Sequence, residues 1–148
     1  MPQSIYFYTK NDPYFELSNF YPQGFEEAGK YWPSVEHYFQ GQKFDNAAYR
    51  EKIRTSGSPK NAKTLGQSRE YKLRDDWEAV KDDIMLHALR QKFRHPKLRQ
   101  LLLETNDNDL IENSPYDKYW GIGQDGQGQN RLGKLLMQVR SEIQNDSE

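Results

Sequence analysis

The chain has no cysteine and only three histidines among its 148 residues. Without cysteine there is no disulfide framework, no thiolate nucleophile and no thiolate metal ligand. The histidines, at positions 37, 87 and 95, do not have the spacing of a metal-binding motif. We therefore expect neither a bound metal nor another cofactor.

Long apolar runs and a strong charge of one sign are also absent. No run of about 18 apolar residues occurs, and the amino terminus lacks the apolar core of a secretory signal. The 21 Lys and Arg residues against 22 Asp and Glu leave a net charge of −1, too little for a general attraction to polyanions. We expect a cytoplasmic protein with no membrane partner.

A chain of this length fits one domain that can bury a core without disulfides or metals. A strand at 4–8 and turns around Gly24 and Gly29 are predicted first, and helix signals dominate afterwards. The predicted helices start at Ser34, at Asp45 or Asn46, at Ser58, at Asp75 or Asp76, at Leu98 and after Asn130, with a short strand at 110–112. No repeat or linker is visible, so residues 1–148 are predicted to form one α+β domain, compact and mainly helical with a small β-sheet.

The segment 31–44, YWPSVEHYFQGQKF, combines an acid, an amide and an amine. Ser34 can cap a helix there, and Glu36, Gln40 and Lys43 then fall at i, i+4 and i+7 on one helical face. A carboxylate and an amine in one cleft can perform proton transfer and covalent chemistry. The alternative is a solvated face on which neither residue has a chemical role.

Residues 121–126, GIGQDG, match the G-x-G-x-x-G dinucleotide fingerprint. The match follows PYDKYW rather than an aliphatic strand and has no suitable acid after it, so we exclude a Rossmann site. The glycines can still bring backbone N–H groups close to an anionic ligand, with Arg131 adding charge and Trp120 stacking on a ring. A flexible loop and a core tryptophan are the alternatives.

Four segments together form a specific pattern that covers nearly the whole chain. They are LSNF at 17–20, WPSVEHYFQ at 32–40 continuing to Lys43 and Phe44, RDDWE at 74–78 with Lys81, and a stretch from Asp117 through Trp120 and Gly121 to NRLGKLLM at 130–137. In this order they resemble the NADAR family, named for NAD and ADP-ribose. The resemblance implies a compact, mainly helical α+β fold.

The same resemblance implies hydrolysis of an N-glycosidic bond between ribose C1 and the nitrogen of a base-like group, as in bacterial YbiA-like members. It also implies that Glu36 and Trp120 lie at the site. Some YbiA-like members carry an aspartate directly after the Trp-Gly pair, where this chain has Ile122. That role would pass to Asp117 or Asp125 here, or the choice of substrate differs.

The chemistry of the side chains suggests a role for each candidate residue in this reaction. Glu36 is the candidate for proton transfer, and Lys43 could attack C1 of the opened sugar to form a Schiff base. Alternatively Lys43 stays charged, and Glu36 or Asp117 activates water. Arginines would hold a ribose phosphate, although Arg69 and Arg74 could equally be solvated surface residues. We predict catalysis by Glu36, Lys43 and Asp117 and substrate binding by Asn19, Phe20, Tyr38, Gln40, Arg69, Arg74, Trp120, Gly121, Asn130 and Arg131.

Three functions remain open. The favoured one is cleavage of phosphoribosylamino-pyrimidine intermediates of the riboflavin pathway by a monomeric protein with a small-molecule substrate. The second is removal of ADP-ribose from guanine in nucleic acid, for which the basic segment 90–99 could follow a backbone or could be an ordinary charged face. The third, a non-catalytic ADP-ribose or nucleotide-binding module, is disfavoured because the chain retains Glu36, Lys43, Asp117 and Trp120 together.

Overall fold

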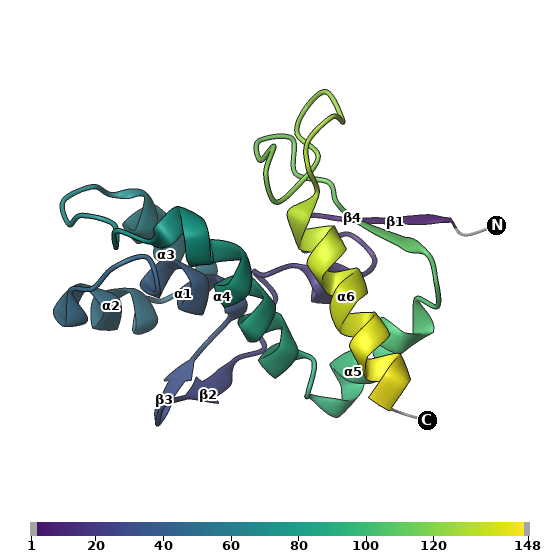
Figure 1. Cartoon of the computed structure of the whole chain (residues 1–148), viewed down its shortest axis with the longest axis horizontal. Helices are drawn as coiled ribbons and strands as arrows, with labels where there is room; N and C mark the ends of the chain where they lie inside the picture. The colour runs from purple at the N-terminus through teal and green to yellow at the C-terminus, as the bar shows by residue number, and fades with distance from the viewer. Residues whose placement is uncertain (1–2, 147–148) are drawn as a thin grey trace. The chain divides into compact units, whose positions relative to one another are not determined.

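The computed structural model describes residues 3–146, which form helices and short strands (Figure 1). The elements are β1 (Ser4–Phe7), the 3₁₀ turn η1 (Phe15–Leu17), β2 (Phe25–Glu27), β3 (Lys30–Trp32), α1 (Val35–Gly41), α2 (Ala47–Arg54), α3 (Pro59–Gln67), α4 (Trp77–Lys92), α5 (Pro96–Glu104), β4 (Asp109–Glu112) and α6 (Arg131–Asp146). The predicted α+β class, mainly helical, is confirmed. The chain divides into two compact units, Asn19–Ala88 and the residues up to Ser18 with those from Leu89, which are described separately.

The unit Asn19–Ala88 contains a β-hairpin, helices α1 to α3 and most of α4. Strand β2 pairs antiparallel with β3, so that Glu27 lies opposite Lys30. The two-residue turn between them, Ala28–Gly29, has φ angles of 52° and 80°, as a tight hairpin turn requires. Helix α1 packs against α2 and α3 (Figure 1). The sequence predicted turns here but not the hairpin, because three-residue strands are too short to show alternation.

Local capping sets the starts of these helices. In each case a side-chain oxygen accepts a backbone N–H three residues later, at 2.9–3.1 Å: Ser34 from His37, Asn46 from Tyr49 and Ser58 from Asn61. Asn46 rather than Asp45 is therefore the cap of α2. Ahead of α4, the carboxylate of Asp76 accepts a hydrogen bond from Arg74, with Oδ1 2.6 Å from Nε.

Aromatic side chains fill much of the core of this unit. Phe44, Tyr49, Ile53 and Ala62 form one buried cluster between α2 and α3. Trp77, on α4, is buried and packs against Phe39 with the ring centroids 5.1 Å apart. Further along α4, Met85, Ala88 and Leu89 are buried, and Val80 and Ile84 are half-buried.

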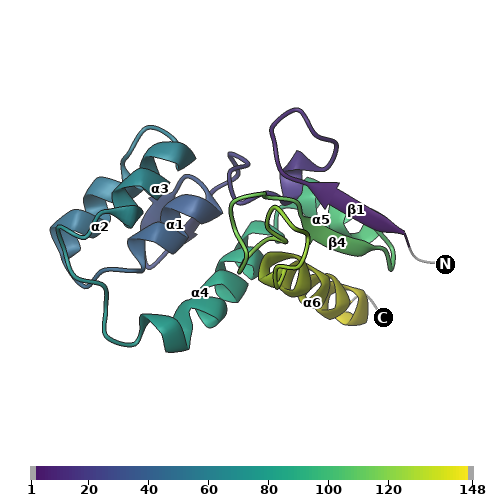
Figure 2. The ribbon, with the colours of Figure 1, turned by 90° about the horizontal axis from the view of Figure 1, so that it is seen from above.

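The other unit is built around the parallel pair of β1 and β4, with Ser4 opposite Asp109 and Phe7 opposite Glu112 (Figure 2). Helix α6 packs against β4, and α5 packs against α6. The buried side of α6 consists of Leu132, Leu135, Leu136 and Val139, with Ile143 half-buried towards its end. The predicted strands near residues 4–8 and 110–112 are confirmed, and the small β content is divided between two separate strand pairs.

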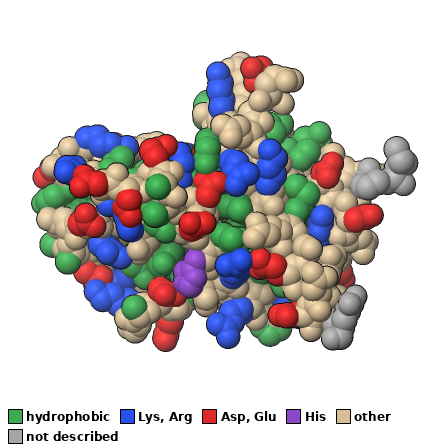
Figure 3. Space-filling view, viewed as in Figure 1, with side chains coloured by type: hydrophobic (Ala, Val, Ile, Leu, Met, Phe, Trp, Pro, Cys, Tyr) green, Lys and Arg blue, Asp and Glu red, His purple; other side chains and the backbone are tan. Residues whose placement is uncertain are grey.

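Charges of both signs are mixed over the face drawn in Figure 3. Several are paired, including Lys30 with Glu51 and Arg90 with Glu142. This mixing agrees with the small net charge of the chain. Within residues 3–146, no helix is both long enough and apolar enough to cross a membrane.

Candidate active site

The N-terminus of α1 is fixed by a buried histidine. His37 Nε2 lies 3.1 Å from Ser56 O, and because a carbonyl only accepts, Nε2 must donate. Nδ1 then accepts from Ser34 Oγ at 2.7 Å, and burial lowers the pKa of His37 from its ordinary value. A neutral His37 therefore holds the capping serine in place and, with it, the start of the helix.

Glu36 and Gln40 form a buried pair one turn apart on α1. Gln40 Nε2 donates to Glu36 Oε2 at 2.6 Å, and the two residues are 4% and 6% exposed. The backbone N–H of Glu36 also donates to Asn19 O at 3.2 Å. This bond joins the helix to the loop that contains Asn19 and Phe20, called the entry loop below. The predicted shared face of Glu36 and Gln40 is confirmed, and their burial excludes the solvated face that was the alternative for Glu36.

A glycine on α3 makes room for this pair. A Cβ placed on Gly66 would lie 1.9 Å from Gln40 Oε1. That oxygen is buried and has no hydrogen-bond partner among residues 3–146. Gly66 lies inside α3, which continues to Gln67. A glycine inside a helix was the signal in the sequence that could have indicated this close contact.

Lys43 is not on α1, because the helix ends at Gly41. Its N–H donates to Gln40 O at 3.3 Å. This tight i→i−3 turn stands where the sequence predicted that the helix would continue. Lys43 Nζ lies 5.8 Å from the centroid of the Phe39 ring. The prediction that Lys43 shares a helical face with Glu36 and Gln40 is therefore wrong.

The entry loop contributes Asn19 and Phe20. Asn19 Nδ2 lies 3.5 Å from Met85 Sδ, and its buried Oδ1 has no hydrogen-bond partner among the described residues. Phe20 lies under Lys63, whose Nζ is 6.0 Å from the ring centroid. Asn19 Oδ1 is thus a buried acceptor available to a ligand in the same unit as Glu36.

The two arginines predicted to bind phosphate in this unit already have protein partners. Arg69 Nη1 donates to the carbonyls of Gly66 and Ser68 at 2.9 and 3.0 Å, at the C-terminal end of α3. Arg74 makes a two-point ion pair with Asp76, which raises the pKa of Arg74. Their proposed phosphate contacts receive no support from these positions.

Tyr38 faces a different side of α1 from Glu36. Its ring meets that of Trp32 edge-on at 5.4 Å, and it lines a separate cavity. Two residues of helix turn a side chain by about 200°, so the acid and the phenol cannot share a face. Tyr38 therefore does not join the cluster around Glu36.

Asp117 shapes the loop that presents Trp120. Its Oδ1 accepts the backbone N–H groups of Tyr119 and Trp120 at 2.9 and 2.8 Å. Trp120 is half-buried, and its ring meets that of Tyr119 edge-on at 4.9 Å. Asp117 thus has a clear structural function, and its catalytic role stays a prediction.

The rest of this loop is held by hydrogen bonds to β4 and within itself. Asn130, at a φ of 50°, accepts from Glu112 N and donates to Leu110 O, both at 2.9 Å. Gly121 packs so closely that a Cβ would lie 2.8 Å from Glu112 O, and Arg131 N donates to Tyr119 O at 3.0 Å. The Asn130 amide therefore stabilises the strand, and the flexible-loop alternative is not supported.

The basic segment 90–99 does not form an open stripe. Lys92 is buried and its Nζ donates to Ser18 O at 2.8 Å, while burial lowers the pKa of Lys92 to about 7. Arg90 binds Glu142, with Nη2 2.7 Å from Oε2. With one cation buried and another paired, the segment no longer argues for contact with a nucleic-acid backbone.

The predicted site residues thus fall into two sets. Those in the unit Asn19–Ala88 are Asn19, Phe20, Glu36, Tyr38, Gln40, Lys43, Arg69 and Arg74. Those in the other unit are Asp117, Trp120, Gly121, Asn130 and Arg131. Within the first set, hydrogen bonds join Glu36 to Gln40 and to the backbone of Asn19.

Comparison with known proteins supports the family pattern. A family model described as NADAR domain matches residues 6–144. The N-glycosidase YbiA of Escherichia coli is 47% identical over 140 residues, covering 94% of this chain and 88% of that protein. An N-glycosidase of Nostoc punctiforme is 45% identical over 146 residues, covering 96% and 94%. A riboflavin biosynthesis protein of Vibrio vulnificus is 40% identical over 145 residues, covering 97% of this chain and 40% of that protein.

The fold agrees as well. The NMR structure of the Escherichia coli protein YbiA superimposes with a TM-score of 0.91 at 45% identity, covering 99% of this chain and 89% of that one. The family model includes residues from both units of the chain. The family resemblance predicted from the four segments is confirmed.

Proposed function

Because this chain belongs to the NADAR domain family, among relatives named as N-glycosidases, we propose that it hydrolyses the C1–N bond of a phosphoribosylamino-pyrimidine. The name of the Vibrio vulnificus relative, a riboflavin biosynthesis protein, supports a substrate from that chemistry. The observation that carries the proposal is the buried Glu36–Gln40 pair on α1. An acid withdrawn from water and held by a neighbour is suited to proton transfer.

In this proposal Glu36 protonates the leaving group. Departure of the pyrimidine amine from C1 leaves positive charge at C1 and requires a proton at the amine nitrogen. Glu36 delivers that proton, and Gln40 keeps the carboxyl group oriented by its bond to Oε2. An uncharged amide is suited to this role because it orients the acid without forming an ion pair with it.

Lys43 supplies the nucleophile. Its neutral amine adds to C1 of the ring-opened sugar, the C1–N bond to the pyrimidine breaks, and the amine leaves with the proton from Glu36. Water then hydrolyses the C1–Nζ imine, which releases the sugar phosphate and restores Lys43. Lys43 is half-buried and follows the last residue of the helix that carries Glu36 by two positions, which supports this role.

Product analysis tests the reaction and the substrate together. The protein is incubated with a phosphoribosylamino-pyrimidine and, separately, with a single strand that carries ADP-ribosylated guanine, and products are identified by mass spectrometry. We expect free ribose 5-phosphate from the first and no change in the second. Release of ADP-ribose from the strand, with the small molecule intact, would replace the proposed substrate with the nucleic-acid one.

A further inference from the structure

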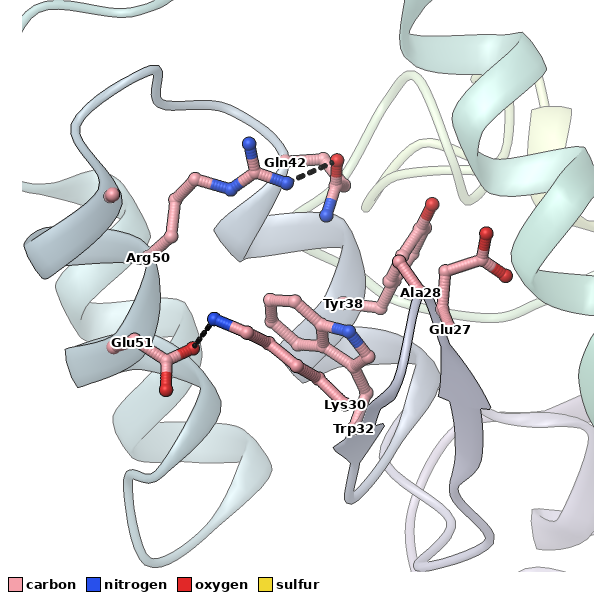
Figure 4. A pocket seen from close by; sticks show the side chains of 9 residues that line it. Glu27, Ala28, Lys30, Trp32, Tyr38, Gln42, Arg50 and Glu51 are labelled. Atoms are coloured by element: carbon pink, nitrogen blue, oxygen red, sulfur yellow. Dashed lines mark hydrogen bonds and ion pairs between the residues drawn. The ribbon is translucent and has the colours of Figure 1, made fainter.

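A cavity lies in the same unit as Glu36, and Glu36 is not among the residues that line it (Figure 4). It has a volume of about 390 Å³ and lies between the β2–β3 hairpin, the end of α1 and the start of α2. Cavities of roughly 300–1,000 Å³ are usual for small-molecule ligands. The residues around it are Glu27, Ala28, Lys30, Trp32, Tyr38, Gln42, Ala47, Arg50 and Glu51.

Of the two acids of this cavity, Glu51 is paired with protein cations and Glu27 contacts a histidine. Glu51 binds Lys30 at 3.0 Å and Arg54 at 2.7 Å, and these partners lower the pKa of Glu51 to about 2. Glu27 contacts His87 Nε2 at 2.9 Å. Arg50 differs, because its Nη2 donates to the neutral amide oxygen of Gln42, at 2.9 Å. Among residues 3–146 it has no carboxylate within ion-pair distance, so one positive charge in the cavity lacks a protein counterion.

Two neutral donors accompany Arg50. Since Gln42 Oε1 accepts from Arg50, the amide nitrogen of Gln42 is directed away from the guanidinium (Figure 4). The pKa of Tyr38 is raised by burial and by the charge of Glu27, so its hydroxyl stays protonated and can donate near neutral pH. The rings of Trp32 and Tyr38, which meet edge-on, form the aromatic part of the cavity wall.

We propose that this cavity binds a small phosphomonoester, held by Arg50, the amide nitrogen of Gln42 and the hydroxyl of Tyr38. A guanidinium donates two parallel hydrogen bonds to a phosphate, and the third terminal oxygen accepts from the neutral donors. The cavity volume leaves space for the sugar that carries the phosphate.

This site is distinct from the proposed catalytic cluster. Tyr38 and Gln42 are four residues apart and share one side of the α1 turn, whereas Glu36 and Gln40 share another, about 200° around the helix. Binding here therefore does not depend on the catalytic acid. Phosphate binding here requires only the residues of the cavity, so it is independent of the proposed reaction.

Titration calorimetry with ribose 5-phosphate and with AMP tests the proposal, with ribose and adenosine as the uncharged counterparts. We expect binding of at least one phosphomonoester and none of its uncharged counterpart. The tighter of the two identifies the ligand as a sugar phosphate or a nucleotide. Arg50→Gln should weaken binding at least tenfold, whereas Lys52→Gln, an equal loss of charge at an exposed position of α2, should change it less than twofold.

Two further variants separate this cavity from other phosphate sites. Gln42→Glu places a carboxylate among the donors and should abolish binding, and a thermal midpoint confirms that both cavity variants are folded. Glu36→Gln should bind as tightly as the parent. The proposal is overturned if Arg50→Gln binds normally, if Glu36→Gln alone abolishes binding, or if neither probe binds at millimolar concentration.

Discussion

Gln40 holds the carboxylate of Glu36 through a 2.6 Å hydrogen bond between Nε2 and Oε2, with both residues buried on α1. The opposite end of the same amide, Oε1, lies where a Cβ of Gly66 would be. The acid is therefore oriented through a chain of contacts from α3 through Gln40 to Glu36. Changes at either end of that chain lead to distinct predictions.

Replacing Glu36 by glutamine should abolish turnover and leave the fold intact. The new amide oxygen can still accept from Gln40 Nε2, but the proton-transfer group is gone, which corresponds to a loss of about 10²–10⁴-fold. The rate of ribose 5-phosphate release and the thermal midpoint are measured together. Glu26→Gln, on the exposed side of β2, is the control and should keep both. Activity within tenfold of the parent would remove Glu36 from the mechanism.

Gly66→Ala should destabilise the protein and reduce its activity. A Cβ at 1.9 Å from Gln40 Oε1 forces the amide away from Glu36, and overpacking of this kind costs about 1–3 kcal/mol. Gly57→Ala is the matched control, because the nearest atom to its Cβ is Asn61 Nδ2 at 3.8 Å. Urea unfolding and turnover are compared for both. Equal behaviour of the two variants would mean that α3 accommodates the methyl group without moving Gln40.

Lys43→Arg should lose nearly all activity while still binding substrate. Arginine keeps the charge and the contact with Phe39, but its guanidinium does not form an imine at working pH. Borohydride added during turnover should leave a stable sugar adduct on Lys43, detected by peptide mass spectrometry. Lys60→Arg, at an exposed position on α3, should remain active and form the adduct. An active Lys43→Arg enzyme would indicate direct attack by water.

Lys92→Met should remove a pH dependence of stability. Burial lowers the pKa of Lys92 to about 7, whereas an unfolded lysine has a pKa of about 10.4. Between these values the unfolded state binds more protons, so the free energy of unfolding of the parent rises from pH 7 to pH 10. We expect a smaller rise in Lys92→Met, measured by urea unfolding across that range. Lys97→Met, at an exposed position, should behave like the parent, and equal slopes in all three proteins would contradict this assignment.

Several features of the fold followed from neighbouring residues alone. The caps at Ser34 and Ser58 were predictable because a cap needs only a suitable side chain and the N–H group three residues later. The pairing of Glu36 with Gln40 followed from their spacing of four residues on a helix. The prediction for Lys43 failed in detail because it assumed that the helix continued beyond Gly41.

The sequence by itself determined the family, the starts of α1 and α3 and the acid–amide pair, because these depend on residue order over a few positions. The start of α5 was misplaced, since this helix begins at Pro96 rather than at Leu98. Tertiary structure alone decided which polar groups lost water. Lys92, read as part of a charged segment, is buried against Ser18 O, which is 74 residues away in the chain. Gly66 leaves space for the amide of Gln40, and the Asn130 amide forms hydrogen bonds with the backbone of β4. Both contacts join segments that are distant in the sequence. Burial and close packing arise only when such segments meet, so spacing along one segment cannot reveal them.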